Sequence, residues 1–310
     1  MGEKQPCSKK ILVCGATGFI GKKLCSLIIK SGHECYVFSR NPSGAEKILP
    51  SAVKIFPWHA TKELPSSQIL EKVDAIVNLI GAPIFTYWTR KKKEEIVESR
   101  IKSTENLVKG ISACNRPPEV YVGASAVGYY GDKGEEELSE DSPPGSDFLA
   151  QLCVAWEREA RRAREYGVRV VCIRTSPVLG RNGGMLEIML RPFRFGLGGP
   201  LSDGKQWMPW IHLEDEVGII LMTIENVKIS GPVNAVAPHQ VRNIEFTKTL
   251  GKLLRRPTFM RVPRFVLKVL LKELGEAMLA SQKVSCRKVL ETGYRYRFPR
   301  LEEALRECLT

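Results

Sequence analysis

The most informative stretch of this chain is Ile11-Leu12-Val13-Cys14-Gly15-Ala16-Thr17-Gly18-Phe19-Ile20-Gly21. An apolar run of strand length passes here into three regularly spaced glycines, and a helix-like segment follows. Glycines let the backbone turn tightly and approach a diphosphate, whose negative charge then faces the helix N-terminus. Since a strand precedes the motif and a helix follows it, the stretch predicts a dinucleotide-binding loop. An ordinary tight strand-to-helix turn is the alternative.

The spacing Gly-x-x-Gly-x-x-Gly resembles the glycine motif of the extended short-chain dehydrogenase/reductase superfamily, whose members include nucleotide-sugar epimerases. The resemblance implies a nicotinamide dinucleotide on a parallel sheet. The expected contacts of the loop with the cofactor are Gly15, Thr17, Gly18, Phe19, Ile20 and Gly21.

The end of the next strand predicts which dinucleotide binds. NAD-specific sites usually place an Asp or Glu about 20 residues after the glycine loop, where it binds the ribose 2′-OH. This chain has Ser39 and Arg40 there. A hydroxyl and a guanidinium suit a 2′-phosphate, which a carboxylate would repel. The predicted cofactor is therefore NADP(H), and the alternative is that Arg40 is a solvated loop residue.

Composition places the chain among ordinary globular proteins. It has 310 residues, 43% of them hydrophobic, which is enough for one large domain or one and a half. The formal charge of +13 is scattered, and its densest run, Arg90–Lys93, is followed at once by Glu94 and Glu95. We interpret that run as a solvated helix face and expect no nucleic-acid partner. No uncharged apolar run reaches the roughly 18 residues of a membrane span, and no signal peptide is expected, so no membrane partner is expected.

The nine cysteines form no Cys-x-x-Cys pair and have no nearby histidine partners. Cys14, Cys153 and Cys172 fall inside apolar strands or helices, where a reduced thiol packs as a small hydrophobe. This distribution predicts a cytoplasmic protein in a reducing environment, without a metal site.

Strand and helix patterns alternate through the first 180 residues. Expected strands cover 10–14, 34–39, 53–56, 74–79, 119–124 and 168–174, and expected helices cover 19–31, 43–49, 67–71, 88–113 and 147–166. This alternation predicts an α/β fold with a Rossmann-type doubly wound parallel sheet. Residues 1–180 form the expected dinucleotide-binding domain. Residues 181–310, where glycine pairs and a Trp-rich loop break the pattern, are expected to form a smaller, mainly helical substrate-side lobe, with some segments returning to the sheet.

Two strand-end turns extend the expected cofactor site. Asn78-Leu79-Ile80-Gly81 resembles the superfamily's Asn-x-x-Gly turn, which passes along the dinucleotide. A glycine turn at the carboxyl end of a strand opens onto the ligand crevice of such sheets, and a plain strand-end turn is the alternative. A later segment resembles the superfamily's Arg-Pro segment, so Ser176, Pro177 and Val178 would contact the nicotinamide carboxamide.

Ser125 is the first candidate catalytic residue. It lies in a segment, 121–131, that resembles the superfamily's catalytic strand, in which a Ser or Thr hydrogen-bonds the reacting carbonyl or hydroxyl. A serine that caps a strand end is the alternative.

The superfamily's usual acid/base pair, Tyr-x-x-x-Lys on the next helix, is missing. There the Lys charge lowers the pKa of the Tyr, but residues 147–157 contain neither residue type. A literal Tyr-x-x-x-Lys at Tyr129 to Lys133 crosses Gly131 in an expected loop, so we interpret it as chance.

Two residues are candidates for the missing proton transfer. Tyr129 lies just past Ser125, and His212 is a residue type that titrates near neutral pH. A His212 that only holds its loop through a hydrogen bond is the alternative.

Taken in order, these motifs resemble the atypical epimerase-family proteins, the cell-division-inhibitor-like branch of the superfamily. The resemblance runs from about residue 9 to 307 and includes Gly196–Pro200, Pro209–His212 and Gly293–Pro299. It implies an NADP-binding fold in which Arg100, on the long helix 88–113, also reaches the cofactor phosphates. The branch has no settled substrate.

Two functions stay open. The first is an NADP(H)-dependent oxidoreductase or epimerase-like enzyme on a small hydroxyl- or carbonyl-bearing substrate, with nucleotide sugars among the candidates. The second is a dinucleotide-binding sensor or scaffold that has lost catalysis and acts through a partner protein. Superfamily members often pair through a helix bundle, but no feature of this sequence decides between a monomer and a homodimer.

Overall fold

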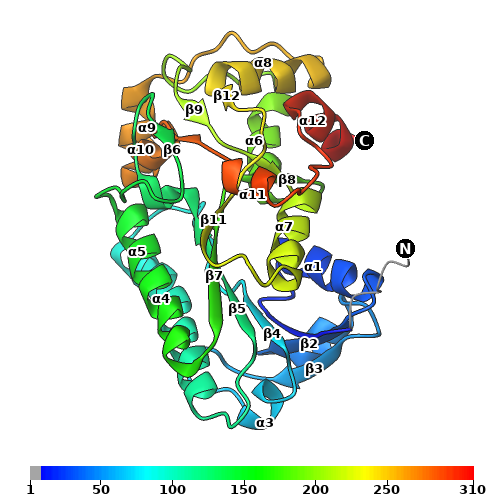
Figure 1. The fold of residues 1–310 in the computed structure, drawn as a ribbon. Helices are drawn as coiled ribbons and strands as arrows, with labels where there is room; N and C mark the ends of the chain where they lie inside the picture. Colours follow the sequence, from blue (N-terminus) through cyan, green and yellow to red (C-terminus); the bar gives the residue numbers. More distant parts are fainter. Residues whose placement is uncertain (1–7) are drawn as a thin grey trace.

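A seven-stranded parallel sheet with helices on both faces organises the computed structural model, which describes residues 8–310 (Figure 1). The strand order is β11-β7-β5-β4-β1-β2-β3. The strand bounds are β1 Lys10–Cys14, β2 Glu34–Ser39, β3 Lys54–Pro57, β4 Ala75–Asn78, β5 Val120–Ala126, β7 Arg169–Thr175 and β11 Gly231–Ala235. The doubly wound fold expected from the sequence is confirmed. Since the order reverses between β1 and β4, the carboxyl ends of these two strands form the crevice where such sheets bind ligands.

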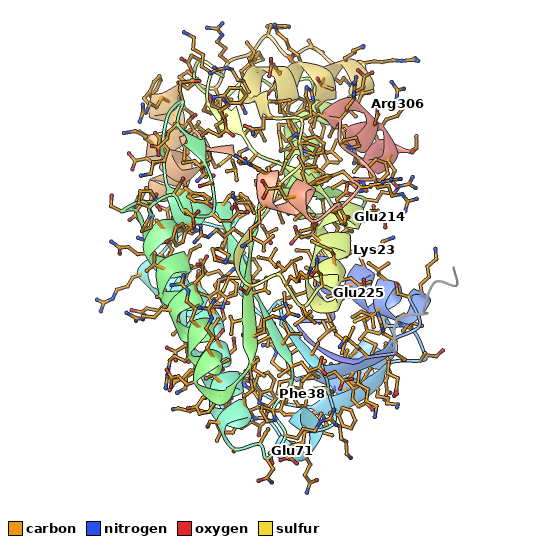
Figure 2. The ribbon with its side chains drawn as sticks, in the orientation of Figure 1. Lys23, Phe38, Glu71, Glu214, Glu225 and Arg306 are labelled. Atoms are coloured by element: carbon orange, nitrogen blue, oxygen red, sulfur yellow. The ribbon has the colours of Figure 1, made fainter. Side chains whose placement is uncertain are left out.

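Each side of the sheet has its own apolar layer, which explains why the strands read as nearly continuous apolar runs. Ile11 and Val13 of β1 pack with α1 (Phe19–Lys30) and α7 (Leu213–Glu225). Leu12 and Cys14 point to the other layer, beneath α4 (Arg90–Ser112) and α5 (Phe148–Arg161). An ion pair between Lys23 of α1 and Glu214 of α7 joins the two helices of the first layer (Figure 2).

Local sequence explains where the long helices begin. Thr89 accepts a hydrogen bond from the Lys92 N–H and so caps α4, and Asp147 accepts one from the Ala150 N–H and caps α5. Two short helices, α2 (Pro42–Glu46) and α3 (Ser67–Leu70), complete the β2–β4 connections. Two short 3-10 helices, η1 (Val127–Tyr130) and η2 (Arg162–Tyr166), follow β5 and α5.

The chain beyond β8 (Val178–Gly180) contributes both to the sheet layers and to a separate apolar cluster. Strand β11 lies beside β7, and α7 packs against α1, while α6, α8 and α12 surround a third core. The remaining bounds are β6 Glu137–Leu138, α6 Gly184–Arg194, β9 Trp207–Met208, β10 Ile211–His212, β12 Val241–Arg242, α8 Asn243–Leu254, α9 Arg264–Leu271, α10 Glu273–Leu279, β13 Lys283–Val284, α11 Arg287–Glu291 and α12 Leu301–Leu309. Within residues 8–310, no helix is both long and apolar enough to cross a membrane.

Candidate functional site

The glycine loop is in contact with the turn that follows β4. Gly15 has a φ of 84°, and an added Cβ there would lie 2.9 Å from the carbonyl carbon of Leu79. An added Cβ at Gly21 would lie 2.3 Å from the Gly15 carbonyl oxygen. Glycine is therefore required at both positions by close backbone approach. Thr17 and Gly18 are exposed at the tip of the loop.

The first turn of α1 is open to an anion. Its N-cap, Gly18, has no side chain to satisfy the first N–H groups, and the first turn holds no acidic residue. A phosphate could therefore accept these hydrogen bonds. Phe19 packs its ring against the turn after β8, because added Cβ atoms at Gly183 and Gly184 would lie 2.3 and 2.9 Å from it.

Asn78 shapes the second turn from inside. Its Nδ2 donates to the Tyr121 hydroxyl at 2.9 Å and to Thr104 Oγ1 at 3.1 Å, and its Oδ1 accepts from the Ile80 N–H at 3.2 Å. The side chain is fully buried, and both its amide nitrogen and its amide oxygen form hydrogen bonds within the protein. The part of the turn left to line the crevice is thus the partly exposed stretch Leu79–Gly81.

Arg100 reaches this turn from α4. An added Cβ at Gly81 would lie 2.8 Å from its Cζ, and the residue is only 7% exposed. Nη1 donates to the Ile96 carbonyl at 3.1 Å, the Trp156 ring lies 5.2 Å from Cζ, and Nε has no hydrogen-bond partner. No carboxylate among residues 8–310 pairs with it, and burial lowers the pKa of Arg100 to about 10.

Ser39 and Arg40 lie at the carboxyl end of β2, two strands from β4. Ser39 Oγ accepts from the Asn41 N–H at 3.1 Å and so shapes the strand end. Arg40 is exposed and forms no hydrogen bond or ion pair with residues 8–310. Its guanidinium is available to a ligand at this edge of the crevice.

Ser176, Pro177 and Val178 connect β7 to neighbouring strands. Ser176 Oγ donates to the Ala235 carbonyl at 2.8 Å, and the Pro177 carbonyl accepts from the Ile211 N–H at 3.1 Å. These hydrogen bonds fix the segment at the carboxyl ends of β7 and β11. The Ser176 hydroxyl is already used in its bond to β11.

A buried polar network surrounds Ser125 at the ends of β5 and β7. Ser125 Oγ donates to Glu157 Oε1 at 2.8 Å, and the same oxygen accepts from Arg174 Nε at 2.8 Å. Arg174 Nη2 and Arg161 Nη2 donate to the other carboxylate oxygen at 3.1 and 2.8 Å. Burial alone lowers the pKa of Arg174, but its hydrogen bonds to Glu157 more than offset that effect and raise it.

The two tyrosines after Ser125 have different surroundings. The ring of Tyr129 lies over Arg174, 3.5 Å from Cζ, and Tyr129 is half-buried. Tyr130 is fully buried, accepts from Arg174 Nη1 at 2.9 Å and donates to Asn234 Oδ1 at 2.6 Å. Burial raises the pKa of Tyr130 to about 12. Tyr129 is therefore the one with access to a ligand.

The superfamily's Tyr–Lys pair is expected on α5, but α5 has Leu149 and Cys153 instead. Leu149 packs on Gly128, whose added Cβ would lie 3.3 Å from the Leu149 Cβ. Cys153 lies against Ser125, and burial raises the pKa of its thiol to about 12. Tyr129 and Lys133 do not share a helix, since η1 ends before Gly131, which has a φ of 68°.

Both ring nitrogens of His212 have hydrogen-bond partners. Its Nδ1 accepts from the Glu214 N–H at 3.2 Å, its Nε2 lies 3.0 Å from Glu307 Oε2, and its ring packs on Phe298 at 3.9 Å. Burial lowers the pKa of His212, which favours the neutral ring. These hydrogen bonds fix the conformation of the loop that contains His212. Within residues 8–310, no hydrogen bond connects His212 to Ser125 or Tyr129.

His212, Glu307 and Cys308 bring three potential metal ligands within 4.8 Å of one another. The hydrogen bonds oppose a metal there. Because Nδ1 accepts a backbone N–H, a neutral ring carries its proton on Nε2 and donates it to Glu307. A metal on Nε2 would need that proton on Nδ1, where the Glu214 N–H already points.

Two buried carboxyl groups were given no site role from the sequence. Glu157 carries the network around Ser125. Its signals are an acidic residue on the apolar face of a helix and its place beside Trp156 in a motif that resembles the family. Glu216 is fully buried on α7; its Oε1 accepts from Thr175 Oγ1 at 2.7 Å, while its Oε2 has no partner among residues 8–310. Burial raises the pKa of Glu216 to about 8.

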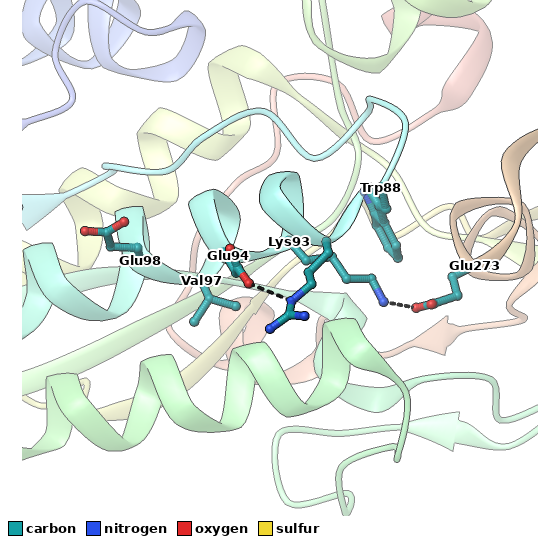
Figure 3. A pocket seen from close by; sticks show the side chains of 7 residues that line it. Trp88, Lys93, Glu94, Val97, Glu98 and Glu273 are labelled. Carbon is teal, nitrogen blue, oxygen red and sulfur yellow. Dashed lines mark hydrogen bonds and ion pairs between the residues drawn. The ribbon is translucent and has the colours of Figure 1, made fainter.

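A surface hollow of about 640 Å³ lies elsewhere, between the start of α4 and α10 (Figure 3). Its lining residues are Trp88, Arg90, Lys93, Glu94, Val97, Glu98 and Glu273. Lys93 and Glu273 form an ion pair across it. None of the expected cofactor-binding or catalytic residues lines this hollow, so it is separate from the dinucleotide crevice.

The sheet order, the glycine loop and the crevice define a Rossmann-type dinucleotide-binding class of protein. The family described as NAD dependent epimerase/dehydratase matches residues 11–236, and the chain belongs to that family. A domain of unknown function, DUF1731, matches residues 262–308.

Relatives along the whole chain confirm the atypical epimerase-family identification made from the motifs. Epimerase family protein SDR39U1 homolog, chloroplastic, from Arabidopsis thaliana is 40% identical, over 96% of this chain and 86% of that protein. Epimerase family protein YfhF from Bacillus subtilis is 34% identical, over 96% of this chain and 97% of that protein. The crystal structure of human epimerase family protein SDR39U1 (isoform 2) with NADPH superposes with a TM-score of 0.84 at 37% identity, covering 96% of this chain and 98% of that one.

Proposed function

We propose that this chain binds NADP(H) in the crevice at the carboxyl ends of β1, β2 and β4. The observation that carries the proposal is Arg100, a buried guanidinium without a carboxylate partner among residues 8–310, set against Gly81. A cation held out of water without a counter-charge is costly, and a cofactor diphosphate would supply the missing anion. The glycine loop touches the same turn, and the human relative holds NADPH.

Arg40 carries the preference for NADP(H) over NAD(H). It is exposed, lacks an acidic partner within residues 8–310 and lies where the ribose 2′-phosphate is expected. The test is calorimetric titration of the purified chain with NADPH and with NADH, for the wild type and for Arg40→Ala. We expect Arg40→Ala to weaken NADPH binding about ten-fold or more and NADH binding less than about two-fold. Equal losses for both would contradict the assignment.

We further propose an oxidoreductase or epimerase-like reaction on a small hydroxyl- or carbonyl-bearing substrate, nucleotide sugars included. When bound, the nicotinamide supplies hydride exchange with a substrate carbon. Ser125 would orient the reacting oxygen. Since it donates its own proton to Glu157, its Oγ is left as an acceptor, which suits a substrate hydroxyl better than a carbonyl. The proton would be exchanged with Tyr129, whose phenolate would take it from a hydroxyl as hydride leaves the carbon and whose phenol would return it when a carbonyl is reduced. Both ring nitrogens of His212 are already hydrogen-bonded.

The reaction is tested by following reduced nicotinamide while the chain is offered a panel of alcohols, carbonyl compounds and sugar nucleotides. We expect turnover that Ser125→Ala and Tyr129→Phe both reduce, the latter because it keeps the ring on Arg174 but removes the hydroxyl. Tight NADPH binding without turnover of any compound in the panel would count against an enzyme.

A dinucleotide sensor or scaffold is the second candidate. It is favoured by Leu149 and Cys153 on α5, where neither residue can move a proton in the way that Tyr and Lys do. A sensor would bind NADPH without hydride transfer, would change its association with a partner protein on binding, and would keep that association in Ser125→Ala.

The state of the cysteines bears on the cellular compartment, whichever of the two functions holds. All eight in the described part of the chain are free, and seven of them are buried. Free thiols are typical of reducing surroundings, so we propose the cytoplasm.

A further inference from the structure

The surface around α9 exposes large apolar side chains. Phe265, Val269 and Leu270 of this helix are 68%, 72% and 63% exposed, and Phe259 and Met260, just before it, are also exposed. Single exposed apolar residues are ordinary on a protein surface, but a contiguous group marks a contact surface.

A second loop extends this group. Phe195 and Leu197, after α6, are exposed in a loop that runs beside the segment leading into α9. The Val262 N–H donates to the Pro200 carbonyl at 2.9 Å, and the Ser202 N–H donates to the Val262 carbonyl at 2.8 Å. We define the α9 patch as Phe195, Leu197, Phe259, Met260, Phe265, Val269 and Leu270. In Figure 1, α9 lies at the edge of the molecule opposite both labelled chain ends.

Five of the seven residues of the α9 patch lie within a strongly basic segment, 252–272. Residues 252–272 hold seven basic residues and no acidic one: Lys252, Arg255, Arg256, Arg261, Arg264, Lys268 and Lys272. Among the described residues, only Lys252 and Lys268 of this set form ion pairs, with Glu302 and Glu276. The four arginines are left without acidic partners in that part of the chain, so the segment attracts anions.

We propose that the α9 patch docks on a membrane surface rich in anionic lipid. Apolar side chains would enter the boundary between headgroups and acyl chains, while the surrounding guanidinium and ammonium groups meet lipid phosphates. A second copy of this chain would bring two such basic segments together, which repel each other. A nucleic acid would satisfy the charges but leave the aliphatic side chains in water. The sequence alone predicted no membrane partner, because exposure of these side chains cannot be read from it.

The test is sedimentation of the full chain with vesicles of phosphatidylcholine alone or mixed with phosphatidylglycerol. We expect binding to the anionic vesicles only, weakened by added salt. Phe265→Ser/Val269→Ser should lower the vesicle affinity at least about ten-fold. The matched control, Leu64→Ser/Val227→Ser, removes apolar side chains of similar exposure elsewhere and should leave the affinity unchanged.

A second pair of variants separates the patch from the overall charge. Arg256→Glu/Arg261→Glu and the control Lys47→Glu/Arg295→Glu change the net charge equally, but only the first should abolish binding. All these side chains are exposed, so NADPH titration should be unaffected and reports folding. Equal binding to neutral and anionic vesicles, or equal losses in patch and control variants, would overturn the proposal. So would a dimer that the patch variants dissociate, without any vesicle binding, because the surface would then join two copies.

Discussion

The Ser125 hydroxyl and the Glu157 carboxylate lie 2.8 Å apart, and this bond ties the end of β5 to α5. Arg174, at the end of β7, donates to the same carboxylate through two nitrogens. One buried acidic group thus connects three elements around the candidate reaction centre. Its charge is balanced by Arg174 and Arg161.

Removing that carboxylate should be costly, because Arg174 would remain buried without a counter-charge. We expect Glu157→Ala to lower the free energy of unfolding by about 3–5 kcal/mol, as for other broken buried ion pairs. Urea denaturation followed by tryptophan fluorescence measures it. Glu165→Ala, an exposed position on the turn after α5, is the control and should stay within about 0.5 kcal/mol of the wild type. A Glu157→Ala protein as stable as this control would show that the network carries little stability.

The close approach of Gly15 to Leu79 can be separated from backbone strain. Gly15 and Gly167 have similar φ values, 84° and 78°, but an added Cβ meets Leu79 only at Gly15 and open space at Gly167. Alanine at Gly167 should therefore cost about 1 kcal/mol of unfolding free energy from strain alone. Gly15→Ala should cost more and also weaken NADPH binding, measured by calorimetry. Identical losses in both variants would mean that the contact with Leu79 is unimportant.

The sheet was readable from the sequence because its central strands, such as β1 and β4, are buried on both faces. The expected strands 10–14 and 34–39 coincide with β1 and β2, since apolar runs end at glycine or polar residues there. The network around Ser125 was not readable, because Arg174 meets Glu157 only when β7 pairs with β5 and α5 covers both. Nor could the pattern distinguish a buried Arg100 from the solvated basic residues on the same helix.

Glu216 should make stability depend on pH. Burial raises its pKa from 4.5 to about 8. The folded state therefore keeps a proton that the unfolded chain releases, so this stabilising effect is complete below about pH 4.5 and is lost as the pH rises to about 8. The free energy of unfolding should fall by about 1.4 kcal/mol per pH unit in that window relative to Glu216→Gln, which has no proton to lose. Urea unfolding at several pH values tests this.

Two comparisons make the Glu216 experiment specific. Glu165→Gln, which removes an exposed carboxyl group, is the matched control for the same chemical change outside the core. A difference between the wild type and Glu216→Gln that did not change between about pH 5 and about pH 8 would mean that Glu216 is already ionised in the folded protein.

Arg100 should act on ligand binding and on stability in opposite directions. Its guanidinium is buried, donates to the Ile96 carbonyl and has no acidic partner within residues 8–310, so the unliganded protein bears an uncompensated charge. Arg100→Met keeps the apolar stem packed near Trp156 and removes that charge. We expect the unliganded variant to be at least as stable as the wild type, while its affinity for NADPH falls about ten-fold or more. Thermal unfolding with and without NADPH measures both effects in one experiment.

Arg116→Met, which removes an exposed arginine paired with Asp74, is the control and should change neither the stability nor the affinity for NADPH. Loss of stability in Arg100→Met without loss of NADPH affinity would make Arg100 a packing residue and remove the main support for the proposed cofactor site.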